Sequence, residues 1–203
     1  MKILYFAAVA ALVMGGVSQA AESNVSTNQT NSANIKARLN ATVEDVQKDV
    51  SLTSAAIANT VTVEGGAAGY VSNTQRFFGD VNAELNGTIR DVAGTVDLTA
   101  AAIANSATIN VDYAGSVSNT QFANYDPTAT VNATVSDVAG DVSGTAAAIS
   151  NTASITGDFG YLGSTQINNA AVNAVANVGV RDVTGSVSAT AAAIGNTLTV
   201  KGF

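Results

Sequence analysis

The sequence states nearly the same phrase four times, and this repetition constrains the fold more than any other feature. DVQKDVSLTSAAIANT begins at Asp45, and related copies begin 46, 46 and 45 residues further along, at Asp91, Asp137 and Asp182. A second phrase, VSNTQ or LGSTQ, falls between the copies at 71–75, 117–121 and 162–166. Periods of this length are typical of repeat architectures, in which each unit buries its apolar surface against its neighbours. We therefore expect a scaffold or surface protein.

The chain divides into a sorting signal, a lead and a repeat domain. Lys2, the apolar stretch 3–14 and the small residues before Ala20 are typical of a secretory signal peptide over residues 1–20. The polar, aperiodic residues 21–34 predict a flexible lead. A four-repeat domain is expected over 35–203. Its units are predicted at about 35–80, 81–126, 127–171 and 172–203.

Composition excludes several classes of protein. There is no cysteine to form a disulfide and no histidine to act as a general base or metal ligand. The net charge is −7, and removal of Lys2 with the signal would make it −8, which disfavours nucleic acid and anionic lipid as partners. The apolar stretch 3–14 is too short to cross a bilayer, and no later segment approaches the length of a transmembrane helix.

The secondary structure of the main phrase is ambiguous in sequence. Flanking segments such as VNATV at 131–135 alternate apolar and polar residues, which favours strands. The alanine run favours a helix, whereas Gly140 and Gly144 oppose one. An apolar stripe with helical spacing also runs through Val138, Val142, Ala146, Ile149 and Ala153. We predict an all-β repeat fold, a β-solenoid of four 45–46-residue units. The alternative is an α/β repeat in which the phrase DVxGxVxxTAAAIxNT is helical.

In a solenoid, equivalent residues of successive repeats would stack as ladders. Parallel rungs lie about 4.8 Å apart, so stacked amides hydrogen-bond along the axis and matched apolar residues fill the interior. Two rungs of about 23 residues, or three shorter ones, could fit one repeat, and the number stays open. The expected ladders are Asn59, Asn105, Asn151 and Asn196, and Ile57, Ile103, Ile149 and Ile194.

Three sets of recurring residues are candidates for sites. The repeated aspartates could form a row of calcium ligands, but one acid per repeat supplies few oxygens, so a turn residue is the favoured interpretation. Asn40, Asn86 and Asn132 stand in Asn-x-Thr triplets and could accept glycans, although a composition rich in Asn and Thr produces such triplets by itself. Aromatic residues follow the NTQ phrases and could be exposed contacts or core; they are Phe77, Phe78, Phe122 and Tyr125.

No enzyme is expected from this sequence. Without His or Cys the chain offers no nucleophile constellation, and it has no phosphate-binding glycine loop. We therefore assign no catalytic, cofactor-binding or metal-binding residues and expect no cofactor.

The VSNTQ copies and the AAIxNT phrases give the chain a resemblance to the secreted curlin-type and holdfast-attachment repeat proteins of bacteria. Curlin repeats have roughly half this period. The resemblance implies export through the outer membrane, surface anchoring, and self-assembly into fibres that mediate adhesion or biofilm formation.

The first functional hypothesis is accordingly a secreted structural protein of the cell surface. Its expected partners are other copies of itself and an outer-membrane secretion or anchoring machinery. A second hypothesis is a soluble solenoid that binds carbohydrate or calcium. A third is an outer-membrane β-barrel, suggested by the final aromatic residue Phe203.

Overall fold

The computed structural model describes residues 4–11, 17–20 and 24–202, and the regular secondary structure within these ranges is strand alone. The all-β prediction is confirmed, and the helical alternative for the repeated phrase is wrong. The strands are β1 (Leu4–Ala11), β2 (Val17–Ala20), β3 (Val25–Asn31), β4 (Ile35–Val46), β5 (Val50–Phe77), β6 (Val81–Val92), β7 (Val96–Ala123), β8 (Pro127–Val138), β9 (Val142–Phe159), β10 (Leu162–Asn168), β11 (Asn173–Val183) and β12 (Val187–Lys201).

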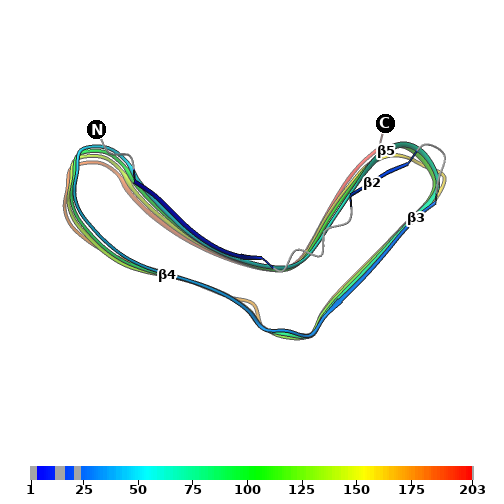
Figure 1. The fold of residues 1–203 in the computed structure, drawn as a ribbon, viewed down its shortest axis with the longest axis horizontal. Coiled ribbons are helices and arrows are strands. Elements are labelled where there is room, and N and C mark those ends of the chain that lie inside the picture. Colours follow the sequence, from blue (N-terminus) through cyan, green and yellow to red (C-terminus); the bar gives the residue numbers. More distant parts are fainter. Residues whose placement is uncertain (1–3, 12–16, 21–23, 203) are drawn as a thin grey trace.

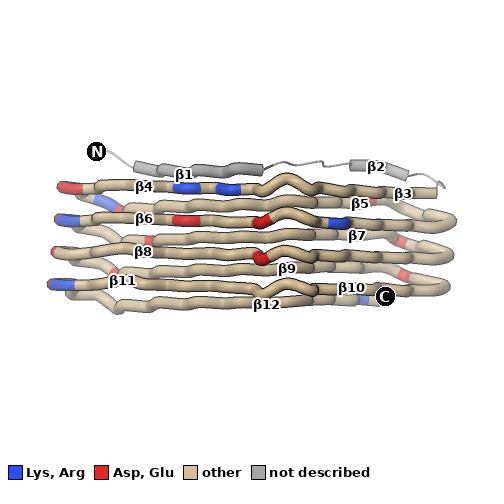
Figure 2. The backbone as a smooth tube through the Cα atoms, turned by 90° about the horizontal axis from the view of Figure 1, so that it is seen from below, with Lys and Arg blue, Asp and Glu red and all other residues tan. Residues whose placement is uncertain are grey.

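Each long strand pairs in parallel with the strand one repeat away. The register joins Val50 to Val96, Val96 to Val142, and Val142 to Val187, so the offset is one repeat. One repeat therefore makes one layer, not the two or three rungs considered from the sequence. Successive layers superpose on a bent outline with two arms (Figure 1) and stack along the perpendicular direction (Figure 2). We number the layers one to five in chain order: 24–46, 50–92, 96–138, 142–183 and 187–201.

The helical stripe has a simple explanation in the strand geometry. Val142 and Ala146 are four residues apart in β9, and an even spacing also places residues on one face of a strand, whereas Val138 is the last residue of β8 and is buried before the turn. The inward phase then shifts, because Ser150 and Asn151 are both buried. Ile149 precedes this shift and lies on the outer surface, only half-buried.

The isoleucine ladder is consequently placed wrongly by the sequence prediction. Ile57, Ile103, Ile149 and Ile194 do pair in register. They lie outside the stack, because alanines two residues apart, such as Ala102 and Ala104, occupy the inward positions around them.

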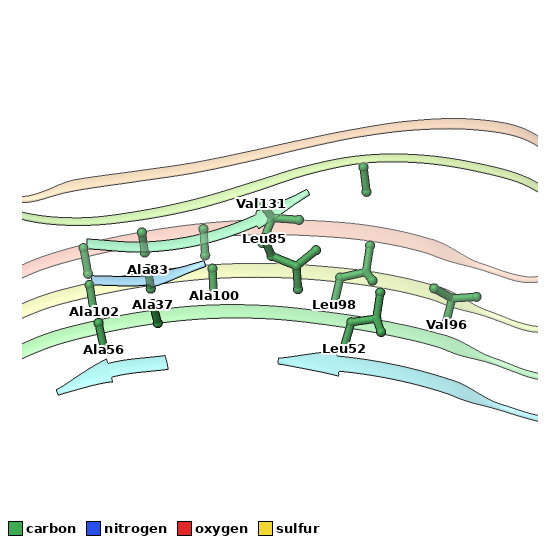
Figure 3. Packing of buried hydrophobic residues seen from close by; sticks show 14 of the residues in the cluster. Ala37, Leu52, Ala56, Ala83, Leu85, Val96, Leu98, Ala100, Ala102 and Val131 are labelled. Carbon is green, nitrogen blue, oxygen red and sulfur yellow. The ribbon is translucent and has the colours of Figure 1, made fainter. Parts of the chain in front are cut away.

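The inside of each arm is a separate apolar cluster. The first arm is the larger; it contains Leu52, Leu85 and Leu98 packed among alanines and valines (Figure 3). The second arm contains Val61, Ile109 and their neighbours. The small alanine side chains let the two walls of a layer approach closely, so each arm has a packed core of its own.

The segment before the first predicted repeat also belongs to the stack. From the sequence we expect a flexible lead over 21–34, whereas Val25–Asn31 forms β3 and pairs in register with Val71–Phe77. The reason is that VSTNQ at 25–29 is a variant of the VSNTQ phrase. Strands β1 and β2, which lie within the predicted signal peptide, pair with β5.

The fourth layer is one residue shorter than the second and third layers, and the difference is absorbed at one point. The pairing of β7 with β9 shifts between Asn110 and Tyr113, opposite Gly157. Gly157 has φ of 144°, a conformation that L side chains rarely adopt. Register is regular on both sides of this position.

Candidate functional site

A ladder of asparagine side chains runs through four layers at the bend between the arms. The Nδ2 of Asn59 donates to the Oδ1 of Asn105 at 2.8 Å, Asn105 donates to Asn151 at 2.7 Å, and Asn151 donates to Asn196 at 2.8 Å. Asn105 is 0% exposed. The predicted asparagine ladder is confirmed, and every bond in it points from the first layers toward the last.

The same asparagines also join the two walls of each layer. Asn59, Asn105 and Asn151 each donate a second hydrogen bond, 3.0 Å long, to a backbone carbonyl on the opposite wall. For Asn105 this acceptor is the carbonyl of Phe122. The walls are therefore tied at the bend by directional bonds, and the apolar cluster is divided there into its two parts.

A ladder of glutamines also runs through the layers, and its hydrogen bonds point in the opposite direction, from the last layers toward the first. The Nε2 of Gln75 donates to the Oε1 of Gln29 at 3.1 Å, Gln121 donates to Gln75 at 2.8 Å, and Gln166 donates to Gln121 at 2.7 Å. Each glutamine also donates to a carbonyl across the bend, as Gln121 does to Thr152 at 2.9 Å. This ladder was not predicted, although the repeated NTQ phrase carries its signal.

The recurring aspartates are the penultimate residues of β4, β6, β8 and β11, at the corners where these strands enter turns. Asp45, Asp91, Asp137 and Asp182 have φ between 53° and 57°, the left-handed region that Asp and Asn tolerate best after glycine. A Cβ added at Gly140, three residues after Asp137, would lie 2.5 Å from the backbone oxygen of Gly94 in the preceding layer. The turn interpretation thus has a geometric basis. Among the residues that the structure describes, no three or more His, Cys, Asp or Glu gather where they could hold a metal ion.

Charged residues are few and scattered over the layers (Figure 2), and some of them form ion pairs between or within layers. Arg38 of layer one bonds Glu84 of layer two at 3.2 Å, and Arg90 of layer two bonds Glu44 of layer one. The hydrogen bond to Glu44 raises the pKa of Arg90 above its ordinary value. The guanidinium of Arg181 lies 3.4 Å from the carboxylate of Asp182.

Carboxylates at the turns accept a hydrogen bond from the turn of the next layer. The backbone N–H of Thr95 donates to the Oδ1 of Asp49 at 2.8 Å, and this bond lowers the pKa of Asp49. Asp141 accepts in the same way from the N–H of Ser186 at 2.7 Å. These side chains link layers at the surface.

The asparagines of the Asn-x-Thr triplets form a second, exposed ladder together with Asn177, which stands in no such triplet. Asn86 donates to Asn40 at 2.9 Å, Asn132 to Asn86 at 3.3 Å, and Asn177 to Asn132 at 3.1 Å. With Thr42, Thr88 and Thr134 they line a groove of ≈ 750 Å³ that crosses the layers. Glycan attachment at these asparagines stays a prediction.

The aromatic residues after the NTQ phrases divide between the inside and the surface. Phe77 is fully buried, whereas Tyr125 is exposed. The rings of Phe78 and Phe122, in successive layers, lie 5.6 Å apart and are half-buried.

Both ends of the stack present strands without a further described partner. At the C-terminal end, β10, β11 and β12 each pair on one edge only within the described residues. Most of the large apolar side chains that are exposed lie there, among them Val187 at 48% and Leu198 at 43%. At the other end, β3 and β4 each pair only with the second layer. Open strand edges are templates for pairing with further strands.

Parallel in-register layers, buried amide ladders and open ends define a structural repeat protein of the all-β class. The family model HfaD, described as Holdfast attachment protein D, matches residues 66–202. The chain therefore belongs to the holdfast attachment protein D family, and the resemblance to holdfast-attachment proteins is confirmed. Membership indicates a component of surface adhesion with a cell-surface location, in a family whose role is attachment.

No curated protein and no solved structure matches the chain. Within the described residues, none forms a helix long and apolar enough to cross a membrane.

Proposed function

We propose that this chain is a secreted structural protein of the bacterial surface that self-assembles into fibres for adhesion or biofilm formation. The stack is a β-solenoid of four 45–46-residue units, at about 35–80, 81–126, 127–171 and 172–203. Residues 1–20 act as a cleaved signal peptide. The fibre is held at the surface by an outer-membrane secretion or anchoring machinery.

One observation carries this proposal: a parallel stack in register whose two ends are open. In the described residues, neither end carries a helix, a proline-rich cover or a set of inward-pointing charges, three of the devices that prevent edge pairing. The buried ladders of Asn59 and Gln75 repeat at every layer, so addition of further layers would extend existing bonds.

The test is to express the full-length gene in a bacterial host and to purify the exported protein. Intact mass measures whether residues 1–20 have been removed. Electron microscopy and thioflavin fluorescence should then show unbranched filaments that grow with protein concentration. A stable monomer at high concentration would contradict fibre assembly, and a mainly helical circular dichroism spectrum would contradict the solenoid.

The exposed groove favours a second candidate function, the binding of a carbohydrate. Its lining of asparagine amides and threonine hydroxyls can donate to and accept from sugar hydroxyls. Calorimetric titration of surface polysaccharide should give binding that Asn132→Ala weakens. An unchanged affinity in that variant would remove the groove from consideration.

A further inference from the structure

The first and last layers of the stack are complementary halves. Layer one, residues 24–46, runs beside residues 71–92 of layer two. Layer five, β12, follows the register of β9, β7 and β5, and so occupies the positions that residues 50–64 occupy in layer two. Residues 24–46 therefore form only the second half of a layer, and β12 forms the first half.

In this structure the signal segment occupies the missing half of layer one. Leu4–Ala11 pairs with Val50–Ile57, and Val17–Ala20 pairs with Thr62–Gly65. Both strands lie before the cleavage position predicted after Ala20. Cleavage would remove them and leave this edge of β5 without its partner strands.

β12 has the sequence that this edge already accepts on its other side. VSATAAAIGNTLTV, from Val187, and VSLTSAAIANTVTV, from Val50, carry the same residue at most positions. Three in-register pairings connect them through the stack: β5 with β7, β7 with β9 and β9 with β12. A strand of this sequence placed on the edge would continue every ladder without a change of register.

We infer that β12 of one copy occupies the vacated edge of β5 in a second copy, so that two half layers close into one full layer shared by two chains. The joint rests on the self-assembly proposed above and specifies its partner, a second copy added head to tail. Repetition of the joint lengthens the stack in one direction.

The two amide ladders are left open at the ends in matching ways. At the C-terminal end, the Nδ2 of Asn196 donates one hydrogen bond among the described residues, 3.3 Å long, to the carbonyl of Gln166, and so can donate a second. No described residue donates to the Oε1 of Gln166. At the other end, no described residue donates to the Oδ1 of Asn59, and Gln29 bonds the carbonyl of Thr60. In the joint, Asn196 donates to Asn59 of the second copy, whose Gln29 donates to Gln166. Both ladders then continue, each in its own direction.

The surface charges are also complementary. Arg181 aligns with the position of Arg90 through the pairing of β11, β8 and β6. Arg90 bonds Glu44 from one side within a copy. In the joint, Arg181 approaches Glu44 of the second copy from the other side, so this carboxylate lies between two guanidinium groups.

Lys48 is the one turn residue that opposes the joint. It occupies the position of Gly94, Gly140 and Gly185, where an added Cβ would lie 2.4 to 2.5 Å from the preceding layer. Lys48 stands in the first such turn, with no described layer before it. In the joint the turn at Gly185 lies against it and must open, so Lys48 slows addition, a role that lysine often has at strand edges.

Cysteine cross-linking tests the register directly, because the chain has no native cysteine. Thr190 aligns with Thr53 through the three pairings. In the joint these residues are neighbours about 4.8 Å apart, whereas within one copy they are separated by three layers, roughly 14 Å. A disulfide spans the first distance and not the second.

The exported Thr53→Cys/Thr190→Cys variant should therefore form a ladder of disulfide-linked multimers on non-reducing gels. Thr62→Cys/Thr190→Cys is the matched control, nine residues out of register, and should stay monomeric on the same gel. Filaments without cross-links in the first variant would overturn the joint and leave fibre assembly intact. Absence of filaments in both the native and the variant protein would overturn both proposals.

Assembly kinetics provide a test that does not depend on loss of function. Lys48→Gly should shorten the lag before filament growth, because it removes the side chain that meets the added turn. Lys48→Ser removes the charge but keeps the Cβ, and should shorten the lag by less than Lys48→Gly does. An unchanged lag in Lys48→Gly would place this turn outside the joint and contradict the inference.

Discussion

The apolar arms and the amide bend hold the same layers together by different means. In the arms, Leu98 and its neighbours gain from burial, which has no direction and tolerates a change of shape. At the bend, Asn105 and Gln121 make bonds to one particular atom above, below and across. Burial of apolar side chains therefore stabilises the stack, whereas the amide hydrogen bonds at the bend specify which residues face one another between layers.

The largest expected effect comes from a charge placed in the bend. Asn105→Asp removes the donor to Asn151 and puts a carboxylate where exposure is zero. We expect a loss of several kcal/mol at pH 7, because an unpaired buried charge is costly. Burial raises the pKa of this new carboxyl, so the loss should shrink as the pH falls and the group is protonated. Denaturant unfolding at pH 7 and pH 4 measures both effects.

Asn132→Asp is the control for that experiment, because Asn132 belongs to the exposed ladder. Its effect should stay below about 1 kcal/mol at both pH values, as for most surface substitutions. Equal losses in the two variants would mean that the buried ladder has no special role.

Shape-conserving substitutions sharpen the comparison at a smaller magnitude. Gln121→Met removes the donor to the Oε1 of Gln75 and to the carbonyl of Thr152, and one of the two acceptors of the Nε2 of Gln166. It should cost on the order of 2–3 kcal/mol. Leu98→Met changes only packing in the first arm and should cost less than about 1.5 kcal/mol. Thermal unfolding of the two variants measures both losses of stability. A larger loss for Leu98→Met would contradict the assignment of specificity to the amide bonds at the bend.

One polar residue lies within the apolar first arm, and its removal should stabilise the protein. The Oγ of Ser54 is buried and has no hydrogen-bond partner among the described residues, and its column continues as Ala100 and Ala146. Ser54→Ala should therefore stabilise the chain by about 1 kcal/mol. A loss of stability would show that the hydroxyl has a partner in solution.

The smallest effect is expected outside both regions, at the cap of a turn. The pKa of Asp49 is lowered by the N–H of Thr95, so its contribution to stability is present above the unfolded pKa, about 3.9, and is lost as the pH falls through the folded pKa. Asp49→Asn should remove this part of the acid dependence. NMR titration of the carboxyl together with melting between pH 5 and pH 2 would test it, and a titration at the ordinary pKa would contradict it.

Much of this architecture was predictable from the chain itself. Spacing alone predicts which residues stack, and the asparagine ladder follows from the positions of Asn59 and its copies. The sequence could not show which face is inward, because spacings of four suit a strand as well as a helix. The shift at Ser150 and Asn151 depends on the bend, a feature of tertiary structure that placed the isoleucines outside.

The candidate site was harder to predict than the stacking. The glutamine ladder has a clear repeat but acts through carbonyls on the opposite wall, such as that of Thr152, and their proximity appears only once the layer is folded. The half layer formed by 24–46 was hidden because VSTNQ differs in order from VSNTQ.

The fourth layer has one residue fewer at Gly157 than the third layer has between Asn110 and Tyr113, and this has a practical consequence. The chain has already changed length at this corner while the ladders on both sides kept their register. The exposed turn at Gly160 and Tyr161, which directly follows this part of β9, is therefore the position at which an epitope or a fluorophore can be inserted with least disturbance. Labels placed there would let the growth of single fibres be followed in living cells.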